Sequence, residues 1–480
     1  MQLRPYQTEI IRKTGSALTR NKRVIMCAPT GSGKTVIFSK IIRRHLERDM
    51  FNRVLVLTHR TELFSQTLEA VVRAGTSVTE LKAGMKTDRI HSECRCLIAM
   101  VETLKRRKLQ DFGKFTLIIV DEAHRADFFP ILENYPEAYI VGATATPISA
   151  SKKNPLKGFY QDIIESVSIT SLIEQGYLSK PNHYKAVFDG SSLQKRAGEY
   201  TSESQFELMS NKVQYENVVQ LWKSHAGDKK TIVFNINKQH TNEVNEMFLS
   251  QNISSTSLLS GDENRDRKIE LFRSGEIQVL NNCEIATTGF DIPDIECVVI
   301  NRATASLPLW LQMVGRGSRT TVNKKQFTIL DFGGNIDRHG MWHIERDWKS
   351  IFWNPKKAGE NPAPHKECPE CGALVFSSLM LCEYCGYKFP SAEQIEAEKV
   401  KGYLEKVGET DIEGSSIDEL TIQQLHHLEL AGKYKPSFIA RVARTRGELS
   451  QYAQLKGYSP GWIRHQMGMD TGYKNYKVKF

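Results

Sequence analysis

The sequence lacks long hydrophobic runs. No apolar stretch in its 480 residues approaches the roughly 20 residues that a membrane-spanning helix requires. The first residues, Met1-Gln2-Leu3-Arg4-Pro5, also lack the basic and apolar regions of a secretory signal peptide. We therefore expect no membrane association and a cytoplasmic location.

Cysteine is scarce outside one short segment. Of the nine cysteines, five are scattered, mostly in strand-like apolar runs, and four lie within residues 368–385. An odd total in a chain expected to be cytosolic argues against a disulfide framework. The five scattered cysteines are expected to be buried, reduced thiols.

Acidic residues are outnumbered, at 55 against 65 Lys and Arg, which gives a net charge of +10. The excess of basic residues is distributed unevenly along the chain. Residues 431–480 hold ten Lys and Arg against two acidic residues, whereas residues 391–430 hold three against ten. A polyanionic partner is compatible with this pattern, although many basic proteins are merely solvated. The length suggests about three domains.

A glycine loop occupies residues 28–35, with the sequence Ala-Pro-Thr-Gly-Ser-Gly-Lys-Thr. It lies between the apolar run Val24–Cys27 and a helical pattern, which is the context of a phosphate-binding loop. A chance Gly/Ser turn beside a lysine is the competing interpretation. In the favoured one, Lys34 reaches the β and γ phosphates of ATP and Thr35 binds Mg²⁺. The rest of the phosphate cradle consists of Thr30, Gly31, Ser32 and Gly33.

Arg4 and Gln7 precede this loop by about twenty residues. A glutamine amide can donate to and accept from an adenine edge, and Arg4 or Tyr6 could stack on the base. The alternative is a helix N-cap. The loop downstream favours an adenine contact.

Two adjacent carboxylates, Asp121 and Glu122, follow the apolar run Leu117–Val120. Asp121 can hold the Mg²⁺ that Thr35 contacts, and Glu122 can orient and deprotonate the attacking water. Apolar runs followed by helical patterns predict a parallel α/β sheet that is buried on both faces. Ligands bind at the carboxyl ends of such strands.

Further apolar runs, at 231–235, 277–281, 297–300 and 327–331, predict a second parallel sheet. Two polar segments accompany it, Ala286 to Pro293 and Gln312 to Arg319. Asp331-Phe332-Gly333 matches a kinase signature, but no kinase glycine loop or catalytic loop accompanies it. We interpret it as a strand end and turn.

Taken in order, these motifs resemble those of the superfamily 2 helicases, including the DEAH box at residues 121–124. The resemblance covers residues 4–335 and implies two tandem RecA-like domains with ATP bound between them. In the sixth motif, Gln312, Arg316 and Arg319 would complete the site, the two arginines facing the γ-phosphate. Gly289 and Asp291 of the fifth motif would also contact the nucleotide.

The resemblance also implies nucleic-acid contacts, at Thr58, Arg60, Thr103, Asn235 and Thr288. Thr288 stands where many RNA-remodelling members have arginine, and Met313 follows Gln312 where common RNA helicases have histidine–arginine or glutamine–arginine openings. Both departures favour DNA over RNA.

Four clustered cysteines form two CxxCG turns separated by ten residues, at Cys368, Cys371, Cys382 and Cys385. This is the spacing of a zinc ribbon with four thiolates. Because no position remains open for water, we assign Zn²⁺ a structural role. A redox CxxC pair would need a thioredoxin-like context that is absent.

The C-terminal region is expected to be helical, first acidic and then basic. The basic part, residues 431–480, interleaves cations with aromatic residues such as Tyr452, Tyr458 and Trp462, and Arg464 within it is a candidate nucleic-acid contact. Cations meet phosphates and rings stack on bases in single-stranded nucleic acid. A small helical domain with a charged face is the alternative.

The whole arrangement resembles the bacterial RadD-type helicases and their phage relatives. We expect RecA-like domains at 1–155 and 156–345, a linker and ribbon at 346–390, and a helical region at 391–480. The resemblance implies an ATP-dependent DNA helicase or translocase in replication, recombination or repair, in a bacterial or phage-infected cytosol. Its DNA would be single-stranded, forked or a junction, and single-strand-binding or recombination proteins would be its protein partners. A DNA-stimulated switch, a restriction-type motor and an RNA helicase stay open as alternatives.

Overall fold

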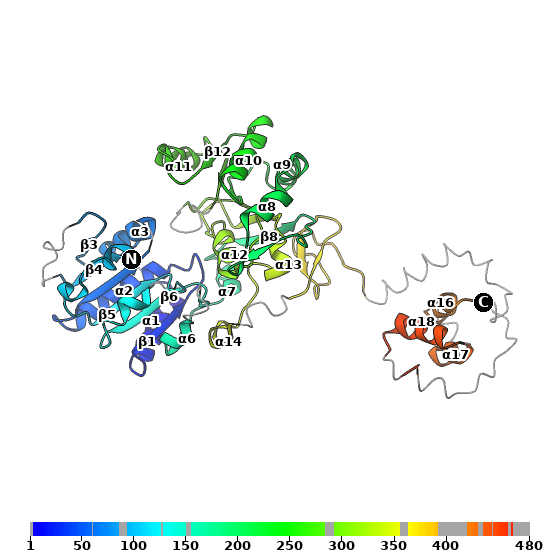
Figure 1. The fold of residues 1–480 in the computed structure, drawn as a ribbon, viewed down its shortest axis with the longest axis horizontal. Coiled ribbons are helices and arrows are strands. Elements are labelled where there is room, and N and C mark those ends of the chain that lie inside the picture. Colours follow the sequence, from blue (N-terminus) through cyan, green and yellow to red (C-terminus); the bar gives the residue numbers. More distant parts are fainter. Residues whose placement is uncertain are drawn as a thin grey trace. The chain divides into compact units, whose positions relative to one another are not determined.

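The computed structural model divides the chain into two compact units, residues 1–377 and 378–480. Figure 1 traces the first unit from blue to yellow and the helices of the second in orange and red. The residues that the structure describes are 3–59, 61–85, 94–125, 128–149, 155–283, 292–355, 363–391, 420–430, 435–443, 445–458 and 462–463.

The first seven strands form one parallel sheet in the order β3-β4-β2-β5-β6-β1-β7. Alternate residues of a strand face opposite sides, so Ile25 and Leu55 belong to one apolar cluster and Val24 and Val54 to another. The strands are β1 (Arg23–Cys27), β2 (Val54–Thr58), β3 (Thr79–Leu81), β4 (Cys96–Met100), β5 (Leu117–Asp121), β6 (Tyr139–Thr144) and β7 (Asp162–Glu165). The helices are α1 (Pro5–Leu18), α2 (Lys34–Arg48), α3 (Thr61–Arg73), α4 (Val101–Leu104), η2 (Leu109–Phe112), α5 (Phe129–Leu132) and α6 (Leu156–Phe159).

A second parallel sheet has the order β12-β13-β11-β14-β15-β8. Its strands are β8 (Lys180–Lys185), β11 (Thr231–Phe234), β12 (Ser255–Leu258), β13 (Val279–Asn282), β14 (Cys297–Ile300) and β15 (Gln326–Asp331). Its helices are α7 (Ile169–Glu174), α8 (Ser202–Met209), α9 (Lys212–Ala226), α10 (Lys238–Ser250), α11 (Arg265–Ser274), α12 (Leu307–Val314) and α13 (Asn335–His339). A short hairpin precedes α8, formed by β9 (Lys195–Arg196) and β10 (Glu199–Tyr200).

The two all-parallel sheets confirm the predicted α/β class. The chain passes from the first sheet to the second between β7 and β8, that is, between residues 165 and 180. The domain limits near residues 155 and 345 stay predictions. Asp331 ends β15 as expected, and its carboxylate accepts the N–H groups of Gly333 and Ile336, which closes the turn.

A helix lies within the segment expected to be a linker. Helix α14 (Trp348–Trp353) packs on the first sheet, where Phe352 is 1% exposed. The Lys349 N–H donates to Glu165 at 2.8 Å, and Lys157 donates to the Trp353 carbonyl at 2.9 Å. Burial of its apolar side chains against the sheet lowers the free energy of this helix relative to an exposed linker.

A hairpin follows α14, formed by β16 (His365–Glu367) and β17 (Leu374–Phe376). Leu374 is 1% exposed in the apolar cluster of the second sheet. His365 Nε2 lies 3.0 Å from Asp337 Oδ1, at the helix after β15. The first half of the predicted ribbon is therefore attached to the second sheet.

The C-terminal unit contains α16 (Ile422–Leu430), α17 (Pro436–Val442) and α18 (Arg446–Lys456), in agreement with the predicted helical region. Tyr452 is fully buried, and its ring lies 5.8 Å from that of Trp462. The Lys456 ammonium pairs with Glu429 at 2.8 Å. Part of the aromatic and basic pattern therefore builds a core. No helix among the described residues is long and apolar enough to cross a membrane.

Candidate active site

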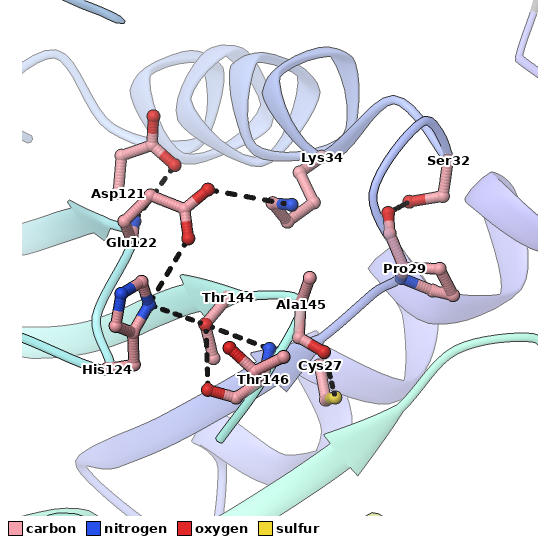
Figure 2. Close-up of polar contacts among 10 residues, drawn as sticks. All are labelled: Cys27, Pro29, Ser32, Lys34, Asp121, Glu122, His124, Thr144, Ala145 and Thr146. Atoms are coloured by element: carbon pink, nitrogen blue, oxygen red, sulfur yellow. Dashed lines mark hydrogen bonds and ion pairs between the residues drawn. The ribbon is translucent and has the colours of Figure 1, made fainter. Parts of the chain in front are cut away.

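The phosphate loop connects β1 to α2 and brings Lys34 to the first residue of the helix. Gly31 and Gly33 have φ values of +83° and +82°, in the left-handed region that glycine adopts without strain. The Ser32 N–H and hydroxyl both donate to the Pro29 carbonyl, at 3.2 and 2.7 Å (Figure 2). The local sequence therefore fixes the curved backbone that phosphate binding requires.

Gln7 contacts this loop from α1. Its amide oxygen accepts the Arg4 N–H at 3.0 Å, and its Nε2 donates to the Ser32 carbonyl at 3.1 Å. The Tyr6 hydroxyl donates to the same carbonyl at 2.7 Å, and the Arg4 guanidinium lies 4.3 Å from the centroid of the Tyr177 ring. Gln7 thus caps the N-terminus of α1 and also stabilises the phosphate loop. Its contact with adenine stays a prediction.

The two carboxylates lie at the carboxyl end of β5, opposite Lys34 (Figure 2). Asp121 is 3% exposed and Glu122 is 8% exposed. Glu122 has a φ of +53°, a costly conformation for a residue with a side chain and one that is common at functional sites. Its Oε1 lies 3.8 Å from Lys34 Nζ and its Oε2 3.3 Å from His124 Nδ1.

The two carboxylates differ in electrostatic environment. Burial, and next the charge of Glu122, raises the pKa of Asp121. Burial would also raise the pKa of Glu122, but Lys34 and His124 outweigh it and hold this pKa below its usual value. Glu122 is therefore ionised at neutral pH.

Asp121 fits the predicted Mg²⁺ position. Its Oδ1 accepts the Glu122 N–H at 3.0 Å, and no described residue forms an ion pair with its carboxylate. Thr35 follows Lys34 on α2 and offers a hydroxyl. Carboxylate and hydroxyl oxygens are hard ligands, which Mg²⁺ prefers, and the ion would neutralise a buried charge.

A series of polar contacts connects Glu122 with the residues at the end of β6 (Figure 2). His124 Nδ1 lies 3.2 Å from Thr144 Oγ1, which donates to the Thr146 carbonyl at 3.1 Å. The Thr146 N–H donates back to Thr144 Oγ1 at 3.1 Å. A change at Glu122 can thus reach the segment that leaves the first sheet.

The loop after α12, residues 315–319, contacts the phosphate loop. A Cβ on Gly31 would lie 2.8 Å from Leu178 Cδ2 and 3.3 Å from Ser318 Oγ. A Cβ on Gly315 would lie 2.8 Å from Thr30 Cγ2. The phosphate loop and the arginine motif, far apart in sequence, therefore pack against each other. Ser318 lies in the segment Gln312 to Arg319 and Leu178 lies just before β8, but no local signal in the sequence indicated that they would meet the phosphate loop.

Arg316 and Arg319 are half-buried in this arginine loop, and Gln312 is buried on α12. Burial lowers the pKa of Arg319. The Lys324 ammonium holds the loop by donating to the carbonyls of Pro293, Ile295 and Gly317, at 2.8, 2.6 and 2.8 Å.

The residues that were predicted to contact nucleic acid are not gathered in one exposed site among the described residues. Thr58 and Asn235 are fully buried, and Thr103 is half-buried on α4. Asn235 Oδ1 accepts from Asn301 at 3.0 Å, and its Nδ2 donates to Asn281 at 3.3 Å. A direct contact of Asn235 with a strand would need this amide network to open, so the assignment stays a prediction. Outside the described residues lie Arg60, Thr288, Gly289, Asp291 and Arg464.

The four cysteines come together as the spacing predicts. Their sulfur atoms all lie within 4.8 Å of one another. The glycines after the two CxxC turns, Gly372 and Gly386, have φ values of +70° and +78°. The Cys368 N–H donates to the Ala373 carbonyl at 2.9 Å, and the Cys382 N–H to the Tyr387 carbonyl at 2.7 Å. Four converging thiols fit a structural Zn²⁺.

Comparison with protein families gives two matches. Residues 1–149 match the model of the type III restriction enzyme res subunit, and residues 213–321 match the helicase conserved C-terminal domain. The two matches contain the phosphate loop and the arginine loop respectively.

Relatives were found among phage, yeast and bacterial proteins. A 51.5 kDa protein of Lactococcus phage isolate 7-9 is 30% identical over 389 residues, covering 79% of this chain and 81% of the phage protein. IRC3 of Saccharomyces cerevisiae, named as an ATP-dependent helicase, is 29% identical over 359 residues, covering 69% of this chain and 51% of IRC3. An endonuclease subunit of the type I restriction enzyme EcoAI from Escherichia coli is 24% identical, covering 68% of this chain and 46% of the subunit. The chain thus spans about half the length of these last two relatives.

Solved structures share the fold. A fragment assigned as an HsdR subunit of a type I restriction enzyme from Vibrio vulnificus YJ016 has a TM-score of 0.56 at 21% identity, covering 72% of this chain and 66% of the fragment. The type ISP restriction-modification enzyme LlaBIII, bound to DNA, has a TM-score of 0.52 at 16% identity, covering 73% of this chain and 29% of LlaBIII.

Proposed function

The chain belongs to the superfamily 2 helicases, and we propose that it is an ATP-driven motor that moves on or remodels DNA in replication, recombination or repair. The observation that carries the proposal is the contact of the phosphate loop with the arginine loop, at Gly31, Ser318, Thr30 and Gly315. ATP bound here would contact both domains, so its hydrolysis would change how they pack.

In the proposed reaction, Lys34 binds the β and γ phosphates. Lys34 lies 3.8 Å from Glu122, so phosphate binding exchanges one anionic partner of the lysine for another. The released Glu122 then orients the attacking water and accepts its proton, while His124 holds the second carboxylate oxygen. Thr35 and Asp121 would hold Mg²⁺, which supplies positive charge at the transferring phosphoryl group.

Arg316 and Arg319 complete the site from the second domain in this proposal. A guanidinium near the γ-phosphate stabilises charge that develops in the transition state, an effect of about 10³–10⁵ in rate in related enzymes. Gln312 lies on the helix that leads into this loop. Turnover would then require the two loops to meet, and their separation would release the products.

DNA is the proposed polymer. Support comes from the match to the res-subunit family, from the restriction-enzyme relatives, and from LlaBIII, which was solved bound to DNA. The carboxyl ends of both sheets would supply the contacts, since Thr58, Thr103 and Asn235 lie in or beside strands there. RNA is disfavoured by Met313, the residue after Gln312.

The ribbon would act as a structural extension of the second domain. Its first hairpin packs there through Leu374, so Zn²⁺ held by the four cysteines would fix a rigid surface for DNA or for a recombination or single-strand-binding protein. Cytosolic action on bacterial or phage DNA follows from the same proposal.

The decisive experiment measures ATP turnover at fixed salt with single-stranded DNA, duplex, fork and RNA, next to a strand-displacement assay. We expect DNA, and fork DNA most, to stimulate wild-type turnover. Lys34→Ala should show no turnover, while Lys40→Ala, on the same helix, should retain it. Hydrolysis without displacement would favour a switch or a translocase that leaves strands paired, and stimulation by RNA alone would refute the DNA assignment.

A further inference from the structure

A cleft lies at the edge of the first sheet opposite the phosphate loop. Its volume is about 520 Å³, and its walls come from α1, α2 and the first residues of β5 and β6, Leu117 and Tyr139. The phosphate loop follows the last residue of β1. Strands β1, β5 and β6 are parallel, so their first residues lie together at one end of the strands and their last residues at the other end. The cleft is therefore separate from the ATP site.

The floor of the cleft is apolar and its rim is cationic. The apolar surface that a ligand could cover comes from Leu18, which is half-buried, and from Tyr139, which is 40% exposed. Arg12, Arg44 and Arg48 line the rim from α1 and α2, and all three are exposed. Among the described residues that line the cleft, none carries a carboxylate.

The rim arginines are available to a ligand. The structure records no ion pair for Arg12, Arg44 or Arg48 among the described residues. Nearby carboxylates are engaged elsewhere, since Glu47 pairs with Arg43 at 2.6 Å and Asp49 accepts the Phe51 N–H at 2.9 Å. The charges of Arg12 and Arg44 act on Glu9 and Glu47 without a direct ion pair, so the three guanidinium groups keep hydrogen-bond donors for an anionic ligand.

The frame of the cleft is held by hydrogen bonds. His45 Nε2 lies 2.8 Å from Thr116 Oγ1, and Asn52 Nδ2 donates to the His45 carbonyl at 2.7 Å. Arg95 also donates to the Asp49 carbonyl at 2.7 Å. These bonds fix the end of α2 against the strands, so the cleft exists before any ligand binds.

Exposed apolar side chains extend the surface beyond the cleft. Met50 and Phe51, in the turn between the lining residues Arg48 and Asn52, are 73% and 77% exposed. These two side chains offer further apolar area that a ligand longer than the cleft could bury. A small molecule held in the cleft would leave them uncovered.

We propose that this cleft binds a short acidic peptide segment of a partner protein, with one large apolar side chain on the floor and carboxylates against the rim arginines. A nucleic-acid backbone matches the arginines but offers no apolar group for Leu18 and Tyr139. Carboxylates pair with guanidinium in a fork geometry, and an aromatic or aliphatic anchor removes the floor from water.

The test is a binding titration without nucleotide, in which the full-length protein is added to a fluorescein-labelled hexapeptide of Asp and Glu with one Phe. We expect saturable binding that Arg12→Glu and Arg44→Glu each weaken by about ten-fold. Lys13→Glu is the matched control, since Lys13 lies next to Arg12 on α1, pairs with Glu9 and does not line the cleft. It should change the affinity by less than about two-fold, because exposed charges outside the cleft contribute little. Replacing Phe by Ala in the peptide should weaken binding to wild type without any change in the protein.

Several outcomes would overturn the proposal: no saturable binding, equal losses with Lys13→Glu, or no effect of the Phe-to-Ala change. A labelled single-stranded DNA provides the alternative arm. If Arg44→Glu weakens DNA binding and leaves peptide binding intact, the cleft belongs to a nucleic-acid surface. ATP turnover should be unchanged in all three variants, and failure of the motor proposal would leave the peptide titration unaffected.

Discussion

Substitution of Gly31 by alanine tests whether the phosphate loop and the arginine loop meet during turnover. The added Cβ would lie 2.8 Å from Leu178 Cδ2 and 3.3 Å from Ser318 Oγ, both on the second-domain side of the contact. Leu178 is 2% exposed, so its side chain has little room to move away. The substitution therefore penalises the arrangement in which the two loops touch.

The free-energy cost of the Gly31→Ala substitution has two contributions, one from the backbone conformation and one from the contact with Leu178. Gly31 has a φ of +83°, and an alanine in that region costs about 1–2 kcal/mol. Gly84→Ala is the matched control, because Gly84 has a φ of +80° and no atom within 4 Å of an added Cβ. Overpacking at Leu178 adds about 1–3 kcal/mol, which corresponds to about a 5- to 150-fold loss of the touching arrangement.

The assay compares ATP turnover and thermal unfolding of both variants. Each should lose similar stability, and Gly31→Ala alone should lose turnover. Leu178→Val shortens the opposing side chain and should restore part of the rate in the double variant. If Gly31→Ala turns over ATP as fast as Gly84→Ala, the loops do not meet in the reactive state. If Leu178→Val restores nothing, the loss arises within the phosphate loop itself.

Three further variants test other parts of the structure. Arg316→Ala should lower kcat by about 10³-fold with little change in ATP affinity, measured by single-turnover kinetics beside a nucleotide titration; a loss of affinity alone would contradict the proposed role. Cys371→Ser should reduce bound zinc, measured by mass spectrometry of the metal, and lower the unfolding temperature, because metal binding supplies about 10 kcal/mol to such sites; full zinc content in the variant would refute the ligand set. Burial, followed by Arg48 and Arg95, lowers the pKa of His45 from 6.5 to about 4. Between these pH values the unfolded chain binds a proton that the folded chain does not, so stability falls on acidification. His45→Gln should lose less stability over that range in urea titrations, and an identical slope in both proteins would contradict this.

The sequence predicted those features that depend on local backbone requirements. A strand, two glycines with positive φ and a helix define the phosphate loop wherever it lies in the chain. A strand that is buried on one face needs an apolar residue only at every second position. Continuous apolar runs therefore predict sheets that are buried on both faces. The two CxxCG turns likewise fix the sulfur positions through short-range geometry. The parallel sheets and the converging cysteines agree with these predictions.

Local patterns could not reveal which side chains the fold would bury. The sequence did not show that Asn235, whose predicted contact with nucleic acid stays a prediction, would lie in an amide network with Asn281 and Asn301. A small helical domain was one of two interpretations of the basic and aromatic tail, and only the structure shows that Tyr452 is fully buried in its core. Trp348 to Trp353 lay in an expected linker, yet they form a helix against the first sheet. In each case contacts between distant segments decide the burial.

The sequence by itself thus determined the chemistry of the phosphate loop, the carboxylates and the cysteines, because each is set by residues close together in the chain. The tertiary structure alone decided that Gly31 faces Leu178 and Ser318, and that Arg12, Arg44 and Arg48 line one cleft together with Leu18 and Tyr139. Such neighbours come from different helices, strands and loops. Their meeting depends on how the two sheets and their helices pack, a long-range property that no local motif encodes.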